Sequence, residues 1–278
     1  MTIGSLFSGI GGLELGLEMA GFGPVKWQVE IDDYATAVLN KNYPDVKRYR
    51  DVHDVGKHNL ESVDLICGGF PCQPFSVAGK QKGAKDDRHL WPEMARVIKE
   101  LRPSLVIAEN VPNISTMELD NAISDLESFG YTVLPALNIP ACALEADHVR
   151  RRIFIVAYLD SIWELQPEGI DGKKRRRSRD GVTEDVAYLA DERLQRGLSA
   201  RENGEGVGRI SDRAGPSVSA QDYVPKEYWD YIPIVGRRIH GIPHRVDRIK
   251  CLGNSVVPQV SHAVGKIIME WLCQYHAK

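Results

Sequence analysis

The residues best suited to chemistry lie in one short stretch, 68–76, which carries Cys72 between two prolines. The apolar run 63–67 precedes it and predicts a buried strand. Cys72 is therefore expected in a loop at the carboxyl end of a strand, where open α/β sheets place their chemistry. Pro71 and Pro74 stiffen the turn, and the glycines before them allow the backbone to approach a ligand closely. A thiol held in this way suits a nucleophile, whereas an ordinary cysteine is usually a small apolar core residue.

An acidic residue and a pair of arginines stand at the ends of two further apolar runs. Glu109 ends a predicted buried strand, so its carboxylate is expected at the same edge of the sheet as Cys72. Arg150 and Arg152 precede the apolar run 153–158, and strand alternation would place both on one face. In isolation, a strand-end glutamate is more often simply exposed, and arginines often flank a strand at the surface. Beside a thiol, these groups indicate a polar site.

A glycine-rich turn near the N-terminus predicts a ligand-binding loop. The segment Phe7-Ser8-Gly9-Ile10-Gly11-Gly12 follows a short predicted strand and leads into a helix that stops at Gly21. Glu30, about 20 residues further on, ends the next strand, where dinucleotide-binding folds place a carboxylate on ribose hydroxyls. Glycine turns of this kind are common, and the alternative for Glu30 is a solvated charge at a helix start.

The hexapeptide Pro71-Cys72-Gln73-Pro74-Phe75-Ser76 resembles the catalytic loop of the DNA (cytosine-5) methyltransferases. Three later motifs of that family follow in its order: Glu109-Asn110-Val111, Arg150-x-Arg152 and Gly253-Asn254-Ser255-Val256-Val257-Pro258. His148 stands where the family carries a glutamine and is a departure from its pattern. The resemblance covers residues 3–158 and 245–278, and it depends on the order and spacing of the motifs rather than on any single one.

The resemblance implies the transfer of a methyl group from S-adenosylmethionine to carbon 5 of a cytosine in duplex DNA. Cys72 would add to carbon 6 as a covalent thioether, which makes carbon 5 able to accept the methyl group. Glu109 would bind the N3 edge and stabilise its protonated form. Arg152 would hold the carbonyl oxygen of the base, and Arg150 would orient the site. Because a thiol cannot reach carbon 6 inside a duplex, the base would be flipped out.

The resemblance also implies which residues bind the cofactor. Phe7 and the glycine backbone would hold its methionine part, Glu30 the ribose and Ile31 the adenine ring, where many relatives carry a larger residue. Asp51 would meet the adenine amino group, although Asp54 is a nearby alternative and a turn aspartate is an equally good interpretation. The residues expected at the cofactor are Phe7, Gly9, Gly11, Gly12, Glu30, Ile31, Asp51, Val52, Gly69, Pro71, Leu90, Asn254 and Ser255. No metal is expected.

The polar segment 79–88 follows the thiol loop and contains glycines and lysines. Beside a nucleophile, such a segment is a candidate lid that closes over substrate, and its cations would face phosphates. The residues expected to contact DNA are Lys80, Gln81, Lys82 and Arg88. The alternative is an ordinary solvated loop, and the same two interpretations stand for the basic run 173–179.

The order of elements predicts an α/β fold, a Rossmann-like and mostly parallel twisted sheet with helices on both faces. We expect residues 1–158 and 245–278 to form one catalytic domain, in which the C-terminal part completes the cofactor pocket. Residues 159–244 are rich in glycine, arginine and acids, and the resemblance makes them a small target-recognition domain. Asn254 and Ser255 would also suit a helix cap.

Composition and charge are those of an ordinary globular protein. The chain has 278 residues, is 43% hydrophobic and carries a net charge of −3. The charge is divided unevenly: residues 1–147 hold 13 Lys+Arg and 21 Asp+Glu, whereas residues 148–250 hold 20 and 16. A basic insertion after an acidic half is expected where only one face meets phosphates.

Other general features concern location and partners. No apolar run approaches the ~18 residues of a membrane span, and the first residues lack a signal-peptide core, so we expect a cytoplasmic protein. Five scattered cysteines favour reduced thiols. A zinc site formed by His240, His244 and Cys251 lacks the usual ligand spacing. We expect a monomer whose partner is double-stranded DNA, with no membrane contact, and a companion restriction endonuclease stays open.

Three other functions stay open at this point. A same-fold enzyme could act on transfer RNA, which a substrate competition between RNA and duplex DNA would reveal. A non-catalytic relative could bind only DNA or a partner methyltransferase, although the intact set of Cys72, Glu109 and Arg152 argues against it. A redox thiol protein is disfavoured because no resolving cysteine is expected near Cys72.

Overall fold

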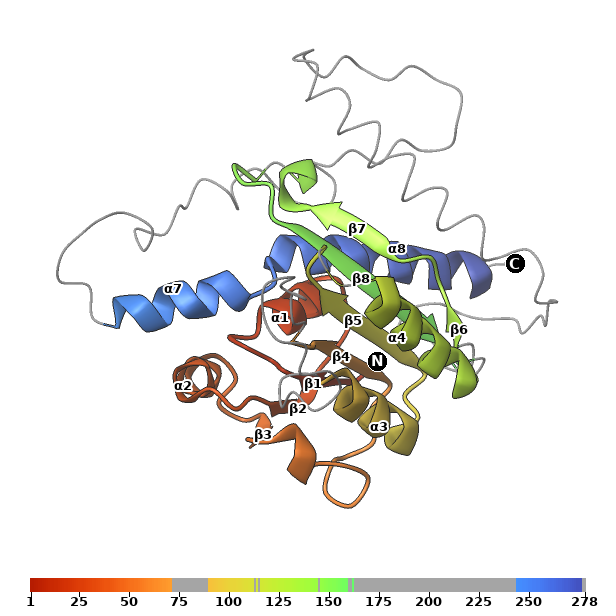
Figure 1. The fold of residues 1–278 in the computed structure, drawn as a ribbon, viewed down its shortest axis with the longest axis horizontal. Coiled ribbons are helices and arrows are strands. Elements are labelled where there is room, and N and C mark those ends of the chain that lie inside the picture. Colours follow the sequence, from red (N-terminus) through yellow and green to blue (C-terminus); the bar gives the residue numbers. More distant parts are fainter. Residues whose placement is uncertain are drawn as a thin grey trace, which may run out of the picture.

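The computed structural model describes residues 1–71, 90–112, 114, 116–144, 146–159, 162 and 244–276. Within these ranges the chain forms one eight-stranded sheet covered by helices (Figure 1). The strands are β1 (Ile3–Leu6), β2 (Val25–Val29), β3 (Lys47–Tyr49), β4 (Leu65–Gly69), β5 (Leu105–Asn110), β6 (Thr132–Val133), β7 (Leu137–Pro140) and β8 (Arg151–Tyr158). The helices are α1 (Gly12–Met19), α2 (Asp33–Asn42), α3 (Trp91–Leu101), α4 (Thr116–Ser128), α7 (Arg245–Asn254) and α8 (Pro258–His276), with the 3₁₀ helices η1 (Val52–Asp54) and η2 (Ala141–Leu144).

The strand order in the sheet is β3-β2-β1-β4-β5-β8-β6, and β7 also pairs with β8. The strands from β1 to β5 pair in parallel, whereas β8 runs antiparallel to β5, β6 and β7. The predicted α/β fold with a mostly parallel sheet is therefore confirmed.

Successive residues of the central strands face two helical layers in turn. In β5, Leu105 and Ile107 pack in the cluster that includes α1 and α8, whereas Val106 and Ala108 pack in the cluster that includes α3 and α4. Because both faces of this strand are buried, its sequence is a continuous apolar run rather than an alternating one.

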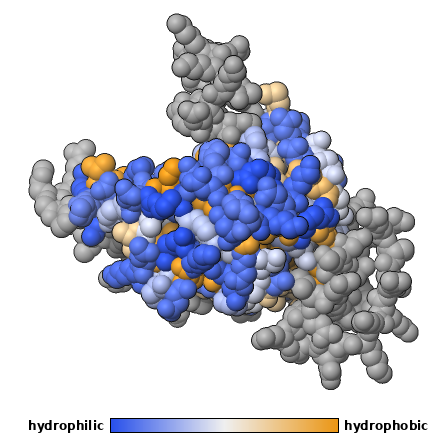
Figure 2. All heavy atoms as spheres, turned by 90° about the horizontal axis from the view of Figure 1, so that it is seen from below, coloured by the Kyte–Doolittle hydropathy of each residue, from blue (hydrophilic) through white to orange (hydrophobic). Residues whose placement is uncertain are grey.

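The outer surface has an ordinary character where Figure 2 shows it. That face is mainly hydrophilic, with hydrophobic residues scattered over it, as is usual for globular proteins. Among the described residues, no helix has the length and apolar character that crossing a membrane requires.

The carboxyl ends of three strands meet at one edge of the sheet. From β1 the chain moves outward to β2 and β3, then returns to form β4 on the other side of β1. Such a reversal opens a crevice at the carboxyl ends of the two central strands. In this parallel register Leu6 lies beside Gly68, and Gly69 lies beside Glu109. The turn after β1, the end of β4 and the end of β5 are therefore neighbours.

The C-terminal helix α8 packs directly on α1. A Cβ at Gly16 would lie 2.0 Å from Ser261 Oγ and 2.1 Å from the carbonyl oxygen of Pro258, so the close approach requires glycine. Ser261 Oγ donates a hydrogen bond to the carbonyl oxygen of Gly12 at 3.1 Å. Helix α8 thus brings the C-terminal part of the chain back to the first turn.

This packing predicts that Gly16→Ala lowers the free energy of unfolding by about 2 kcal/mol, because the new methyl group overlaps backbone and forces the helices apart. Gly253→Ala is the matched control, since a Cβ there meets no atom within 4 Å. That control is expected to be neutral or stabilising by up to about 1 kcal/mol, because glycine is a poor helix former. Urea unfolding followed by circular dichroism measures both, and equal losses would contradict the packing argument.

Candidate active site

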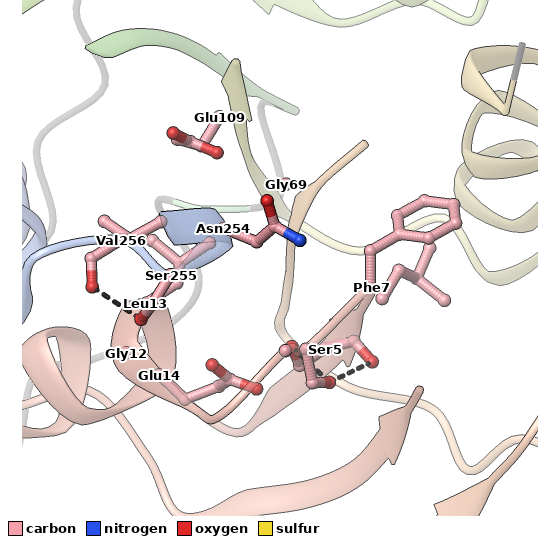
Figure 3. Close-up of a pocket in the computed structure, with 13 residues that line it drawn as sticks. Ser5, Phe7, Gly12, Leu13, Glu14, Gly69, Glu109, Asn254, Ser255 and Val256 are labelled. Carbon is pink, nitrogen blue, oxygen red and sulfur yellow. Dashed lines mark hydrogen bonds between the residues drawn. The ribbon is translucent and has the colours of Figure 1, made fainter. Parts of the chain in front are cut away.

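A pocket opens at the edge of the sheet where β1, β4 and β5 end (Figure 3). It is lined by Ser5, Leu6, Phe7, Ser8, Gly9, Gly12, Leu13, Glu14, Gly69, Glu109, Asn254, Ser255 and Val256. The lining comes from the turn after β1 and the start of α1, from the ends of β4 and β5, and from the junction between α7 and α8. Predicted site residues from three distant parts of the sequence therefore share one cavity.

The turn after β1 presents backbone rather than side chains to the pocket. Gly11 has φ 87° at the N-cap of α1, and no side chain makes a capping hydrogen bond there. A Cβ at Gly9 would meet no atom within 4 Å, so the turn is open at that point. The first amides of a helix without a side-chain cap are suited to bind an anionic group.

Glu30 braces this turn from the end of β2. Its Oε2 accepts a hydrogen bond from the Gly9 amide at 2.7 Å, and its Oε1 accepts one from the Asp32 amide at 2.8 Å. Each carboxylate oxygen has a further lone pair, so Glu30 can still accept hydrogen bonds from a ligand. The next residue, Ile31, is 67% exposed. An apolar surface is thus available beside the carboxylate.

Asp51 lies after β3, next to the end of β2. Its Oδ1 accepts a hydrogen bond from the His53 amide at 2.9 Å and lies 2.7 Å from His53 Nδ1. These hydrogen bonds lower the pKa of Asp51 and raise that of His53. Val52, the residue after Asp51, is buried. The pocket of Figure 3 is not lined by Asp51, Val52, Glu30 or Ile31, which lie at the ends of the neighbouring strands.

Glu109 stands at the end of β5 and is 7% exposed. Its Oε1 lies 2.7 Å from Arg152 Nε. Burial raises the pKa of Glu109 to about 7, although the charges of Arg152 and Arg150 act in the opposite direction. A Cβ at Gly69 would lie 2.7 Å from Glu109 Oε2, so a glycine on β4 leaves room for the carboxyl group. A carboxyl group that changes protonation near neutral pH suits general acid–base catalysis.

Arg150 contacts a different part of the site. Strand β8 begins at Arg151, and Arg150 precedes it with φ 26°, so the expected strand alternation does not extend to this residue. Its Nη2 donates hydrogen bonds to the carbonyl oxygens of Gly253, at 2.8 Å, and Ser255, at 2.5 Å. Arg150 thus contacts the α7–α8 junction, whereas Arg152 pairs with the acid at the end of β5.

Asn110 is a positioning residue that our sequence reasoning did not single out. Its Nδ2 donates a hydrogen bond to the carbonyl oxygen of Phe70 at 3.1 Å, and its Oδ1 accepts one from the Val111 amide at 2.8 Å. The side chain therefore ties the end of β5 to the chain just before Pro71. Its position next to Glu109 in the Glu-Asn-Val motif was the available signal.

Glu14 was also missed, although it lines the pocket and is 0% exposed. Its Oε1 accepts a hydrogen bond from Gln28 Nε2 at 3.3 Å. Burial raises the pKa of Glu14, and the hydroxyl groups of Ser5 and Ser8 oppose that rise. A polar residue in the first turn of a helix is ordinarily exposed, so the sequence carried no signal for its burial.

Several predicted site residues lie outside the described residues. They are Cys72, Lys80, Gln81, Lys82 and Arg88, together with the basic run 173–179. The predicted domain 159–244 also lies outside them, except for a few residues at its edges. Pro71 is the last described residue before the thiol loop. Leu90, where the description resumes, occupies the N-cap position of α3.

The structure argues against Cys67 as an alternative nucleophile to Cys72. None of the described cysteines, Cys67, Cys142, Cys251 and Cys273, is in a disulfide. Cys67 is close to Cys72 in sequence but is wholly buried in β4, and burial raises its pKa well above the ordinary value, which makes it inert. In the part of the chain that the structure describes, no group of three His, Cys, Asp or Glu residues is placed to hold a metal ion.

Comparison with known proteins gives one matching family and several similar relatives. The model of a family described as C-5 cytosine-specific DNA methylase matches residues 1–206. The Type II methyltransferase M.PspPI of Psychrobacter sp. (strain TA137) is 41% identical over 166 residues, which cover 57% of this chain and 40% of that protein. M.NgoBI of Neisseria gonorrhoeae is 33% identical over 230 residues, which cover 78% of this chain and 71% of that protein. The aligned part thus spans less than half of the first relative.

Two solved structures share the fold. A mutant of Spodoptera frugiperda DNMT2 has a TM-score of 0.60 at 18% identity, with 96% of this chain and 99% of that chain covered. The Entamoeba histolytica methyltransferase EhMeth has a TM-score of 0.58 at 20% identity, with 99% and 98% covered. At these identities the likeness concerns the fold alone. The family match across residues 1–206 and the identity to M.NgoBI go further, and the chain therefore belongs to the C-5 cytosine-specific DNA methylase family.

Proposed function

We propose that this protein transfers a methyl group from S-adenosylmethionine to carbon 5 of a cytosine in duplex DNA. The observation that carries the proposal is the pocket, which joins the glycine turn and the α7–α8 junction to Glu109 and its partner Arg152. A methyl donor at one end of this cavity would face a base at the other. Membership of the family and the Type II relatives support the same activity.

The residues around the pocket suit S-adenosylmethionine. Its amino-acid end carries a carboxylate, which the uncapped amides at the start of α1 would bind. Glu30 and Asp51 would accept hydrogen bonds from the ribose hydroxyls and the adenine amino group, and the exposed side chain of Ile31 would pack on the ring. Asn254 and Ser255 would close the pocket from the C-terminal side. When bound, the cofactor supplies an electrophilic methyl group.

We assign the covalent step to Cys72, which directly follows Pro71. Carbon 5 of cytosine is a poor nucleophile until a thiolate adds at carbon 6. The sulfur–carbon 6 bond forms as N3 takes a proton from Glu109, and the electron pair of the carbon 5–carbon 6 double bond becomes available at carbon 5. Methylation leaves S-adenosylhomocysteine, carbon 5 then gives its proton to water, and the sulfur–carbon 6 bond breaks, which returns the electron pair to the thiolate. N3 then returns its proton to Glu109, so both groups are restored.

The surroundings of Glu109 support its role as the proton donor. Burial lifts its pKa to about 7, so a substantial fraction of the carboxyl group is protonated near neutral pH. The contact of 2.7 Å with Arg152 fixes the orientation of the carboxyl group, and the remaining guanidinium donors would bind the carbonyl oxygen of the base. An acid and a cation side by side would hold N3 of the cytosine ring and the exocyclic carbonyl oxygen on the neighbouring carbon.

DNA must be distorted for this chemistry to occur. The pocket is a cavity at the sheet edge, and carbon 6 of a stacked, paired cytosine is out of reach of a thiol, so the base would be flipped into the site. We propose that residues 159–244 form the target-recognition domain and that Lys80, Gln81, Lys82 and Arg88 contact the DNA. Their cations would neutralise phosphates, which makes binding dependent on salt.

The direct test is transfer of a tritiated methyl group from S-adenosylmethionine to unmethylated duplex DNA, followed by bisulfite sequencing of the product. The proposal predicts incorporation at carbon 5 of cytosine in one fixed sequence context. Transfer RNA is the competing substrate in a parallel reaction. Incorporation into RNA alone, or into neither nucleic acid while the cofactor still binds, would contradict the proposed substrate.

The role of Glu109 predicts a pH dependence. Because the protonated form acts on N3, and burial places the pKa near 7, kcat/KM divided by the thiolate fraction of Cys72, which pH-dependent alkylation measures, should fall about tenfold per pH unit above that value. Glu109→Gln should lower kcat/KM by about 10²-fold or more and remove this alkaline decline, since an amide does not titrate. Glu118→Gln, at a buried glutamate that does not line the pocket, is the control and should keep the decline. If the alkaline decline survives in Glu109→Gln, the group that titrates is not Glu109.

The covalent step predicts that Cys72→Ser abolishes methyl transfer while leaving the fold and cofactor affinity intact, because a hydroxyl group is a far weaker nucleophile than a thiolate. Cys142→Ser is the matched control, since this thiol is not in a disulfide and does not line the pocket. Methyl transfer, circular dichroism and calorimetric titration with S-adenosylmethionine would be measured on both variants. Normal turnover by Cys72→Ser would sink the assignment.

A further inference from the structure

We propose that Arg150 is a positioning residue that latches the segment 253–255 over the pocket and thereby sets the affinity for the cofactor. This inference rests on the proposed function, because it names the ligand whose affinity the latch controls. The family resemblance implies that Arg152 holds the carbonyl oxygen of the base and that Arg150 orients the site, and the inference says through which contacts Arg150 does so. Arg152 acts at the base, and Arg150 acts through the C-terminal segment.

The two hydrogen bonds of Arg150 reach the residues that precede and follow Asn254, which closes the pocket. One nitrogen, Nη2, donates to the carbonyl oxygens of Gly253 and Ser255, which stand on either side of Asn254. Asn254 and Ser255 both line the pocket, and Figure 3 shows their side chains on the side of the cavity opposite Phe7. A single guanidinium group therefore holds the backbone of this wall from outside.

The helix before this wall is attached to α2 at its far end, where the rings of its N-cap residue His244 and of Tyr34 lie 5.7 Å apart. In α7, Cys251 is buried, while Val246, Ile249 and Leu252 are exposed. Lys250 forms an ion pair of 2.6 Å with Asp32, the N-cap residue of α2, but the Lys250 side chain is 61% exposed, and exposed ion pairs contribute little. Figure 1 shows α7 extending away from the sheet. Within the described part of the chain, the bonds from Arg150 are therefore a principal attachment of the end of α7.

The chain that leads from the wall into α8 packs closely on α1, as α8 itself does. Gly12 leaves room for the chain there, since a Cβ would lie 2.3 Å from the carbonyl oxygen of Val256 and 2.5 Å from Ser255 Oγ. The wall thus lies between a firmly packed α8 and a weakly attached α7. We therefore expect the hydrogen bonds from Arg150 to Gly253 and Ser255 to keep Asn254, the residue between them, in its place at the pocket.

The backbone of Arg150 indicates a constrained role. Its φ of 26° is a conformation that residues with a side chain rarely adopt, and such strain costs on the order of 1–3 kcal/mol. The local backbone is held by the Ala141 amide, which donates to the carbonyl oxygens of Val149 at 2.8 Å and Arg150 at 3.4 Å. Glycine would adopt this φ without strain. An arginine at this position thus costs conformational free energy, and the two hydrogen bonds made by its side chain give a reason for that cost.

The test compares four variants of the full chain with the wild type. Arg150→Met removes the donors and keeps a long side chain, and Arg150→Lys keeps the charge. Arg150→Gly removes the side chain while relieving the backbone strain, so it should fold even if Arg150→Met does not. Arg151→Met is the matched control, because alternation along β8 places its side chain on the face opposite Arg152. Calorimetric titration gives Kd for S-adenosylmethionine and S-adenosylhomocysteine, and hydrogen-exchange mass spectrometry reports on residues 250–257.

The latch predicts that Arg150→Met and Arg150→Gly weaken both ligands by about tenfold or more, as expected for loss of hydrogen bonds from a charged donor. Exchange in peptides that cover 250–257 should become faster, and Arg150→Lys should recover part of both effects. In turnover, the KM for the cofactor should rise more than kcat falls. Arg151→Met should match the wild type in Kd and exchange.

Two outcomes would overturn the inference. One is that Arg150→Met and Arg150→Gly keep wild-type Kd values and wild-type exchange over 250–257. The other is that kcat falls at saturating cofactor while Kd stays unchanged, which would place Arg150 at the base instead. If the wild type bound neither ligand, the proposed function itself would fail, and the exchange comparison would still report separately whether Arg150 holds the segment.

Discussion

The parallel register of β1, β4 and β5 is the constraint on which the site depends. Each of these strands is buried on both faces, so their relative positions are set by core packing on two helical layers. The register brings Gly69 beside Glu109 and places both next to the turn that follows β1. A carboxyl group with a pKa near 7 and an open glycine turn come to share one cavity because three separate strands end at the same edge.

The C-terminal segment supplies the wall that this edge lacks. Helix α8 can reach α1 because Gly16 leaves space for Ser261 and Pro258, and the chain before α8 then crosses the mouth of the pocket. The two contacts of Arg150 hold this crossing from the side of β8. Under the proposed function, a cofactor bound against the glycine turn would be enclosed by residues from both ends of the catalytic domain.

Much of this arrangement could be predicted from the sequence, because buried strands give continuous apolar runs, and the order and spacing of the motifs indicate which strand ends carry the site. The rest lies where local rules are broken. Glu14 is buried although Leu15 beside it is 46% exposed, so apolar spacing misplaces the inner face of α1. At Arg150 a positive φ ends strand alternation. The bond from Asn110 to the Phe70 carbonyl exists only once β4 and β5 have paired. Exceptions of this kind are expected at functional sites.

The central claim is that Cys72 attacks a cytosine held at Glu109, and trapping the covalent species tests it most directly. The protein would be incubated with S-adenosylmethionine and duplex DNA that carries 5-fluorocytosine, then digested and analysed by mass spectrometry. Fluorine at carbon 5 cannot leave as a proton does, so the sulfur–carbon 6 bond persists after methylation. The account predicts a methylated fluorocytosine attached to the peptide that contains Cys72. Methyl transfer to ordinary DNA without any trapped adduct, or an adduct on another residue, would contradict it.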